Sequence, residues 1–286
     1  MTVQCWVSPA KLNLCLHITG RYDNGYHALQ SLFVPVSLCD EIRIRPREDE
    51  RIEREGGLPG LAADADLAVR AAHSLSGHMG GHPFGVDLEV IKRIPAGAGL
   101  GGGSSNAATV LLALNAMWGA GCDEHCLLKL ATALGADVPF FLDARPAWVE
   151  GIGERMTPVS VDDAAFLVVV PPVHVSTAEV FSHPKLTRNQ PLTKMSALSR
   201  SGRVSEIVEN GVNNCESVVR DLAPEVSQVF EWLEKFGAPR MSGTGSAVFV
   251  VLDDAAAAGA ALSKLPARWR GWSTEIWSGS RRVSCG

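Results

Sequence analysis

The sequence has little that would mark a membrane, fibrous or disordered protein. No apolar run approaches the roughly 20 residues of a membrane-spanning helix, and the strongest, 164–172, ends in two prolines. Residues 1–9 carry no basic segment and no long apolar stretch, so we expect neither a signal peptide nor a transit segment. With 46% hydrophobic and 20% charged residues, the composition excludes a disordered or coiled-coil chain.

A strong net charge is also missing. The chain has 26 Lys and Arg against 31 Asp and Glu, for a formal net charge of −5 at pH 7. It therefore lacks the broad positive field that non-specific binding of nucleic acid or anionic membrane requires, and we expect neither partner. No interface stripe stands out in the sequence, which leaves a monomer and a homodimer both open as oligomeric states.

Cysteines are few, odd in number and irregularly spaced, at Cys5, Cys15, Cys39, Cys122, Cys126, Cys215 and Cys285. In a chain without a visible secretion signal this pattern argues against a disulfide framework, so we expect reduced structural thiols and a cytoplasmic protein. Cys122 and Cys126 are one helical turn apart. No second pair with zinc-ligand spacing accompanies them, and the histidines show no such spacing with acids.

Strand-like and helix-like segments alternate along the chain. Period-two and apolar patterns predict strands over 4–19, 29–38, 41–45, 84–91, 147–149, 165–170, 247–252 and 272–277. Helices are expected over 66–75, 104–117, 123–134, 205–212, 218–221, 225–236 and 255–265. Asn24 and Gly25 form a strong turn signal, and the dense charge run 47–55 is typical of a solvated connection or hairpin.

The composition of the sequence changes around 171–191, where four prolines occur. This region is a plausible connection between two parts of the chain. The mixture of early antiparallel hairpins with later strands and helices predicts an α+β protein of two lobes. We divide it into residues 1–160 and 161–286.

A glycine cluster between a strand and a helix is the strongest chemical signal. Glycines let backbone N–H groups approach an anion closely, and the start of the next helix adds unpaired N–H donors and a favourable dipole. Ser104 or Ser105 is expected to cap that helix. We therefore predict a phosphate-binding loop formed by Pro95, Ala96, Gly97, Ala98, Gly99, Leu100, Gly101, Gly102, Gly103, Ser104 and Ser105.

The loop departs from two common phosphate-binding patterns. Gly97, Gly99 and Gly102 satisfy G-x-G-x-x-G, but no strand ending in an acid follows about 20 residues later, as a dinucleotide site needs. A P-loop would carry Lys where Gly103 stands. A loop without its own lysine needs Mg²⁺ or a distant lysine. Lys11, inside an apolar strand, either faces solvent or serves such a site.

Three weaker signals accompany the loop. Asp137 follows a helix stop at Gly135, where it either turns the chain or orients a hydroxyl nucleophile, as an Asp does in kinases. The segment 242–246, Ser-Gly-Thr-Gly-Ser, is either a plain glycine turn or a cover over bound phosphates. His27, beside Tyr26, is a lesser candidate, since a lone surface histidine is more often structural.

Taken together, these motifs resemble those of the GHMP kinase superfamily. Its ATP loop matches Pro95-x-x-x-Gly99-Leu100-Gly101-x-Gly103-Ser104-Ser105, and its third motif matches Gly243-Thr244-Gly245. Within the superfamily, the resemblance is strongest to the kinases of a cytidine diphosphate-linked methylerythritol. It spans about residue 4 to about residue 252 and rests on four stretches: 8–14 (SPAKLNL), 25–33 (GYHALQSLF), 99–108 and 135–140 (GADVPF).

The resemblance implies a fold and a reaction. The fold has an N-terminal lobe like the second domain of ribosomal protein S5, a ferredoxin-like C-terminal lobe, and substrates in the cleft between them. ATP, with Mg²⁺, would phosphorylate the 2-hydroxyl of the methylerythritol unit in non-mevalonate isoprenoid precursor synthesis. Asp137 would accept or orient the hydroxyl proton, and Lys11 would keep Asp137 ionised and stabilise the transferring group. The metal ligands stay unidentified, with Ser104 suggested by the superfamily.

The resemblance also implies a substrate pocket. Asn13 would position the erythritol portion, and Thr177 would lie near it. Tyr26 and His27 would frame and hydrogen-bond the cytosine, and Phe181 would stack on its other face. A cytosine ring needs an aromatic face and hydrogen bonds to its edge, which are the side-chain types found here.

Other interpretations differ in what they require. A GHMP kinase of a simple alcohol would not need the base-recognition segment around Tyr26 and His27. A non-catalytic nucleotide-binding regulator would not need both Lys11 and Asp137, and a Rossmann dehydrogenase would need the missing acid. The superfamily branch usually has Asp where Asn24 stands, but Asn-Gly turns as readily. The tail 277–286 aligns with no motif.

Overall fold

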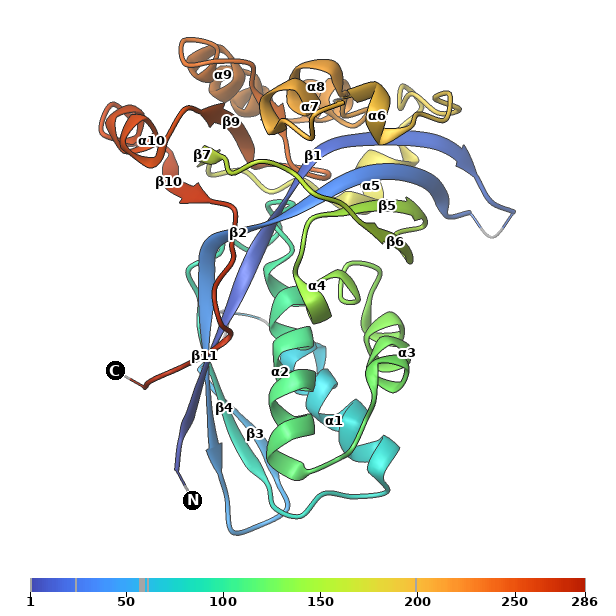
Figure 1. Ribbon diagram of the computed structural model, residues 1–286, viewed down its shortest axis with the longest axis vertical. Helices are drawn as coiled ribbons and strands as arrows, with labels where there is room; N and C mark the ends of the chain where they lie inside the picture. Colours follow the sequence, from blue (N-terminus) through green and yellow to red (C-terminus); the bar gives the residue numbers. More distant parts are fainter. Residues whose placement is uncertain (1, 24, 57–59, 61, 199, 286) are drawn as a thin grey trace.

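The computed structural model (Figure 1) describes residues 2–23, 25–56, 60, 62–198 and 200–285, so Asn24 of the predicted turn lies outside the described residues. Two β-sheets organise this part of the chain. The seven-stranded sheet contains β1 (Gln4–Arg21), β2 (His27–Pro46), β3 (Ile52–Glu55), β4 (Val86–Ile91), β5 (Ala147–Gly151), β6 (Arg155–Pro158) and β11 (Arg282–Val283). The four-stranded sheet contains β7 (Ala165–Val170), β8 (Arg240–Met241), β9 (Val248–Leu252) and β10 (Arg270–Glu275).

The helices fall into two groups along the chain. The first group accompanies the larger sheet and contains η1 (Ala63–Ala65), α1 (Leu67–Met79), α2 (Gly102–Trp118), α3 (Glu124–Leu134) and α4 (Phe140–Asp143). The second group contains α5 (Thr177–Ser182), α6 (Met195–Leu198), α7 (Val204–Asn210), α8 (Glu216–Leu222), α9 (Pro224–Leu233) and α10 (Ala255–Leu262). The predicted mixture of helices and strands in an α+β fold is confirmed.

A long antiparallel hairpin of β1 and β2 forms the spine of the molecule (Figure 1). The prediction of two strands over 29–38 and 41–45 is wrong, because β2 runs unbroken through Cys39 and Asp40. Asp40 is fully buried there and its carboxylate accepts hydrogen bonds from the backbone N–H groups of Arg93 and Ile94. Part of the predicted solvated connection is β3, which pairs in parallel with β4.

Helices α1 and α2 cover one face of the larger sheet, and α3 packs against these two helices (Figure 1). Their apolar side chains, such as Leu75 and Leu111, pack with Leu88 of β4 in one core. A second core joins the two sheets, because Leu12 of β1 packs in the same cluster as Phe249 of β9. This shared core fixes the larger sheet against the smaller one. The boundary between residues 160 and 161 stays a prediction.

The start of α2 differs from the predicted one. Ser104 and Ser105 are not the N-cap, since the helix begins at Gly102 and Gly101 caps it with a positive φ of 71°. Glycine adopts this left-handed conformation without a steric penalty, whereas serine does not. Ser105 instead lies inside the first turn, where its hydroxyl accepts a hydrogen bond of 2.7 Å from Ser8 of β1.

The tail of the chain returns to the larger sheet. Strand β11 pairs antiparallel with β1, and this pairing sets Cys285 beside Cys5 with a Cα–Cα distance of 5.2 Å. The two residues form a disulfide bond, so the expectation of seven reduced thiols is wrong for this pair. Spacing along the sequence could not reveal the bond, because it depends on a strand pairing between the two ends of the chain. Cys15, Cys39, Cys122, Cys126 and Cys215 are free thiols, as predicted.

Arg281 of the same tail ties two helices together. Its guanidinium donates a 2.7 Å hydrogen bond to Thr109 Oγ1 of α2 and another to the carbonyl oxygen of Phe141 in α4. Burial lowers its pKa to about 10. The C-terminal tail is therefore bound to α2 and α4.

We expect Arg281→Ala to lower the free energy of unfolding by about 1–3 kcal/mol, because it leaves buried acceptors without their donor. Urea denaturation at neutral pH measures this difference. Arg282→Ala, at an exposed neighbouring position, serves as the matched control and should change stability little. Equal stabilities for the two variants would mean that Arg281 does not support the helices.

Among the described residues, no helix combines the length and apolar character needed to cross a membrane.

Candidate active site

One large cavity collects side chains from distant parts of the sequence. It has a volume of about 890 Å³ and is lined from β1, the glycine loop, the turn before α4, α5 and the 242–246 segment. The predicted site residues that line it are Lys11, Asn13, Tyr26, His27, Gly97, Gly99, Gly101, Ser104, Asp137, Thr177 and Phe181. A second cavity of about 360 Å³ is lined by residues 95–104 of the glycine loop. Ser105 lines neither of these two cavities.

The glycine loop is held in place from both sides. The backbone N–H of Lys11 donates to the carbonyl of Leu100 at 2.9 Å, and Ser242 Oγ donates to the carbonyl of Gly99 at 2.9 Å. Gly99 has a positive φ of 77°, and a Cβ at this position would meet the Ser242 carbonyl oxygen at 2.1 Å. The close approach requires glycine. The loop is thus a fixed backbone surface at the start of α2, and 242–246 is more than a plain turn.

Lys11 and Asp137 form an ion pair in the lining of the large cavity. Lys11, on β1, is only 3% exposed, and its Nζ lies 3.6 Å from Asp137 Oδ2. Burial lowers the pKa of Lys11 and the nearby Asp137 carboxylate partly opposes that shift. The Asp137 side chain is 35% exposed, so it is reachable from the cavity. Of the two alternatives for Lys11, the structure rules out the one in which it faces solvent.

Asn13 is fixed in one orientation beside this pair. Its Oδ1 accepts a hydrogen bond from Lys11 Nζ, and its Nδ2 donates to Ser31 Oγ at 2.9 Å. Its backbone N–H donates to Ser242 Oγ at 3.2 Å, which links β1 to the 242–246 segment. The lysine ammonium is therefore positioned by an amide oxygen as well as by the carboxylate.

The rings of Tyr26, His27 and Phe181 line one part of the cavity, which we call its aromatic end. His27 and Phe181 stack on each other, with ring centroids 5.1 Å apart and planes inclined by 23°. The roles of Tyr26 and His27 in framing the cytosine, and of Phe181 in stacking on its other face, stay predictions. Tyr26, 61% exposed, lines the same end. Thr177 lies at the start of α5, with its hydroxyl 2.9 Å from that of Thr244.

Arg188 sets the protonation state of His27 and was not anticipated from the sequence. Its Nε donates a hydrogen bond of 3.1 Å to His27 Nε2. Burial, with the positive charges of Arg188 and Arg21, lowers the pKa of His27. Since Arg only donates, His27 is neutral near pH 7 and carries its proton on Nδ1. No local pattern marks Arg188, which stands among prolines and polar residues.

Lys92 is a second lysine at the glycine loop, also not anticipated. Its Nζ is paired with the buried carboxylate of Asp40, and a Cβ on Gly102 would come within 3.1 Å of it. An ammonium group thus stands at the N-terminus of α2, where helix geometry already favours anions. The position just before the Pro95 segment was its only signal in the sequence.

Comparison with known proteins gives the family of the chain. Sequence profiles of the GHMP kinases N terminal domain and the GHMP kinases C terminal domain match residues 66–144 and 195–271. A 4-diphosphocytidyl-2-C-methyl-D-erythritol kinase of Halorhodospira halophila is 49% identical over 270 residues, covering 93% of this chain and 91% of that protein. The chain belongs to this family of GHMP kinases.

Other relatives are also similar to this chain, both in sequence and in structure. The 4-diphosphocytidyl-2-C-methyl-D-erythritol kinase of Alkalilimnicola ehrlichii is 48% identical, covering 93% of this chain and 89% of that protein. A crystal structure of 4-(cytidine 5'-diphospho)-2C-methyl-D-erythritol kinase superposes with a TM-score of 0.83 at 34% identity, covering 96% and 100% of the two chains. Homoserine kinase from Cytophaga hutchinsonii reaches 0.71 at 16% identity, covering 96% and 95%, and shows only the shared fold.

Proposed function

We propose that the chain transfers the γ-phosphoryl group of ATP to the 2-hydroxyl of 4-diphosphocytidyl-2-C-methyl-D-erythritol, giving the 2-phosphate and ADP. The observation that carries the proposal is one cavity holding both the Lys11–Asp137 pair and an aromatic end beside the glycine loop. The names of relatives that are 48–49% identical over most of the chain support the same substrate. The reaction belongs to non-mevalonate isoprenoid precursor synthesis, and we place it in the cytoplasm.

ATP is proposed to lie across the glycine loop. Its phosphates would contact the N-terminus of α2, where the first N–H groups have no partner within the helix. Lys92, whose side chain lines the smaller cavity, would add positive charge. The smaller cavity would take part of the nucleotide, and the large cavity would take the acceptor. In this arrangement the two substrates meet at Gly99 and Gly101, which line both cavities.

Mg²⁺ fits the donor set at this junction. It prefers oxygen ligands and usually keeps several waters while binding phosphates and one or two protein groups. The hydroxyl of Ser104, which lines both cavities, is a ligand of that kind. When bound, the ion would neutralise phosphate charge, and the other steps described here depend on the chain's own residues.

We propose a catalytic role for each residue from the charge of its side chain and from its position in the large cavity. The Asp137 carboxylate would orient the acceptor hydroxyl and take its proton as the phosphoryl group is transferred. Lys11 would hold Asp137 in its ionised form and offset negative charge on the transferring group. Asn13, hydrogen-bonded to Lys11, would keep the ammonium in place. Phosphoryl transfer requires positioning and charge stabilisation more than covalent chemistry, which matches this set of residues.

Base recognition is proposed at the aromatic end. Neutral His27, with its proton on Nδ1, would donate to an acceptor on the cytosine edge, while Arg188 holds its Nε2. Because Phe181 packs on His27 itself, it would support that ring, and Tyr26 would supply the face on which the base stacks. A simple-alcohol kinase needs no such end, and a non-catalytic regulator needs no Lys11–Asp137 pair.

Tyr26→Ala is expected to raise the KM for the cytidyl substrate about 10-fold, since stacking of a base on an aromatic ring is worth about 1–3 kcal/mol. The KM for ATP should stay unchanged. Steady-state kinetics with each substrate varied in turn measures both values. Tyr22→Ala is the matched control, because Tyr22 is also exposed but does not line the cavity. An unchanged KM for the cytidyl substrate would place the base elsewhere.

Product analysis tests the proposed reaction. The chain is incubated with ATP, Mg²⁺ and the cytidyl substrate, and the product is examined by mass spectrometry and phosphorus NMR. We expect the gain of one phosphoryl group, with the new phosphorus signal coupled to the carbon that bears the 2-hydroxyl. Transfer to a different hydroxyl, or no transfer, would contradict the proposal.

A further inference from the structure

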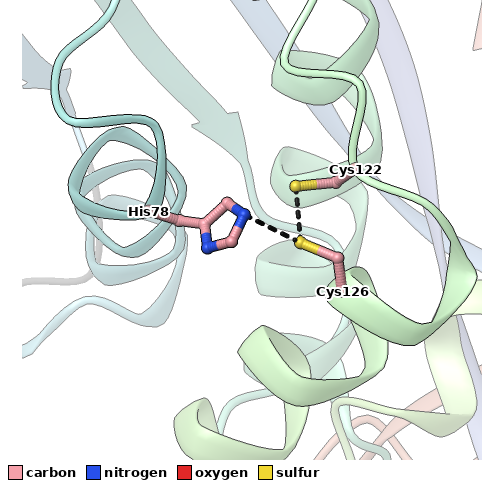
Figure 2. A group of neighbouring side chains, drawn as sticks. All are labelled: His78, Cys122 and Cys126. Carbon is pink, nitrogen blue, oxygen red and sulfur yellow. Dashed lines mark hydrogen bonds between the residues drawn. The ribbon is translucent and has the colours of Figure 1, made fainter.

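A second cluster of reactive side chains lies away from the cavity. His78 in the last turn of α1, Cys122 between α2 and α3, and Cys126 in the first turn of α3 point toward one another (Figure 2). One ligand atom from each lies within 4.8 Å of the other two. Among the residues that the structure describes, this is the one such group of three His, Cys, Asp or Glu side chains.

The three ligand atoms lie closer together than they would around a bound metal ion. Cys126 Sγ lies 2.6 Å from Cys122 Sγ and 3.2 Å from His78 Nε2. In a tetrahedral zinc site, bonds of about 2.3 Å to sulfur and about 2.0 Å to nitrogen separate the ligand atoms by about 3.5–3.8 Å. Binding an ion would therefore require the side chains to rotate apart, by about 1 Å for the two sulfurs.

Hydrogen bonds to neighbouring residues fix the backbone that carries the two thiols. Asn115 of α2 binds Cys122 twice, with Nδ2 donating to its carbonyl oxygen at 2.9 Å and Oδ1 accepting from its N–H at 3.0 Å. Asp123 caps α3 by accepting from the N–H of Cys126 at 2.8 Å. The main chain that carries the two thiols is therefore fixed even without a bound ion.

We propose that His78, Cys122 and Cys126 form a binding site for a soft or borderline-soft metal ion, such as Zn²⁺. Two sulfurs and one imidazole nitrogen suit such ions and do not suit Mg²⁺. His78 is exposed and the cysteines are half-buried, so an ion has access from solvent and water can take the fourth position.

The place of the cluster in the fold indicates a structural role. It lies beside the C-terminal end of α2, whereas the glycine loop precedes the N-terminal end of this helix of 17 residues. At about 1.5 Å per residue the helix separates the two sites by about 25 Å. The ion would join α1 to α3 and would take no part in phosphoryl transfer.

Zinc titration of the whole reduced chain tests the proposal. The background carries Cys5→Ser and Cys285→Ser, so that the thiols of the opened disulfide cannot bind the probe. With a chromophoric chelator as competitor, we expect one Zn²⁺ per chain. Cobalt substitution should give a sulfur-to-metal charge-transfer band, and Zn²⁺ should raise the Tm, since it binds the folded state.

Variants assign the ligands. Cys126→Ser and, separately, His78→Ala should weaken zinc binding at least about 10-fold and abolish the Tm increase. Cys39→Ser, which removes a free thiol outside the cluster, should bind like the parent. His78 is exposed, so its replacement leaves the core intact if Cys126→Ser does not fold. Absent zinc binding, or equal binding by all variants, would overturn the proposal. A Cys122–Cys126 disulfide that takes up no metal once reduced would also overturn it and mark a redox pair.

Discussion

Asp137→Asn is expected to lower kcat for phosphorylation of the cytidyl substrate by about 10²–10⁴-fold, the range for losing a general base. The amide keeps the shape of the side chain but cannot take the hydroxyl proton. ATP affinity should change little, because in the proposed arrangement the nucleotide contacts the glycine loop. Initial rates of ADP release give kcat, and equilibrium dialysis of ATP gives the affinity.

The control for this variant lies a short distance along the chain. Asp143→Asn alters an exposed carboxylate at the end of α4 that pairs with Arg145 and does not line the cavity. It should leave kcat within about twofold, as surface substitutions usually do. Near-normal turnover of Asp137→Asn would reduce Asp137 to a turn residue and remove the proposed base.

Lys11→Ala is expected to be comparably damaging. The substitution removes the buried ammonium 3.6 Å from Asp137 and the hydrogen bond that it donates to Asn13 Oδ1. Transition-state charge would then be less well stabilised, so kcat should fall by about 10²-fold or more. Lys129→Ala, on an exposed position of α3, is the matched control. Circular dichroism checks that the variant is folded, and wild-type turnover in a folded Lys11→Ala would exclude Lys11 from the mechanism.

The pH dependence of the wild-type enzyme provides a second test of Lys11. Burial lowers its pKa below the ordinary value of about 10.4. A lysine is charged below its pKa, so kcat/KM should fall as pH rises through that lowered value. Since kcat/KM reports groups of the free enzyme, the alkaline decrease should start earlier than for an ordinary lysine. An alkaline profile that is the same in Lys11→Ala would assign the decrease to another group.

Local signals in the sequence predicted several elements well. Helix α3 ends at Leu134 before Gly135 and starts beside its Asp123 cap, and β7 spans the predicted 165–170. Here the cap, the stop and the apolar run are contained in the element itself. β2 was divided in two because Asp40 breaks its apolar pattern. The burial of Asp40 depends on its ion pair with Lys92. Lys92 is 52 residues away in the sequence, so no short stretch of sequence around Asp40 contains it.

Only those parts of the site that carry a local sequence motif could be predicted from the sequence. The composition of the glycine loop was enough to predict a phosphate-binding site. The nearness of Lys11 to Asp137, in contrast, followed only from the resemblance to a known family. Arg188 acts through a hydrogen bond to His27, and the Cys5–Cys285 bond depends on pairing between the chain ends. Such contacts come from tertiary packing, which local patterns do not encode.

The most direct measurement of the central claim is ADP release by the purified chain with ATP and Mg²⁺ across a set of acceptors. The set contains 4-diphosphocytidyl-2-C-methyl-D-erythritol, homoserine, mevalonate and no acceptor. We predict ADP with the cytidyl substrate alone, at a rate that Asp137→Asn lowers by about 10²–10⁴-fold. ADP formed equally well with homoserine or mevalonate, or ATP binding without ADP from any acceptor, would contradict the account.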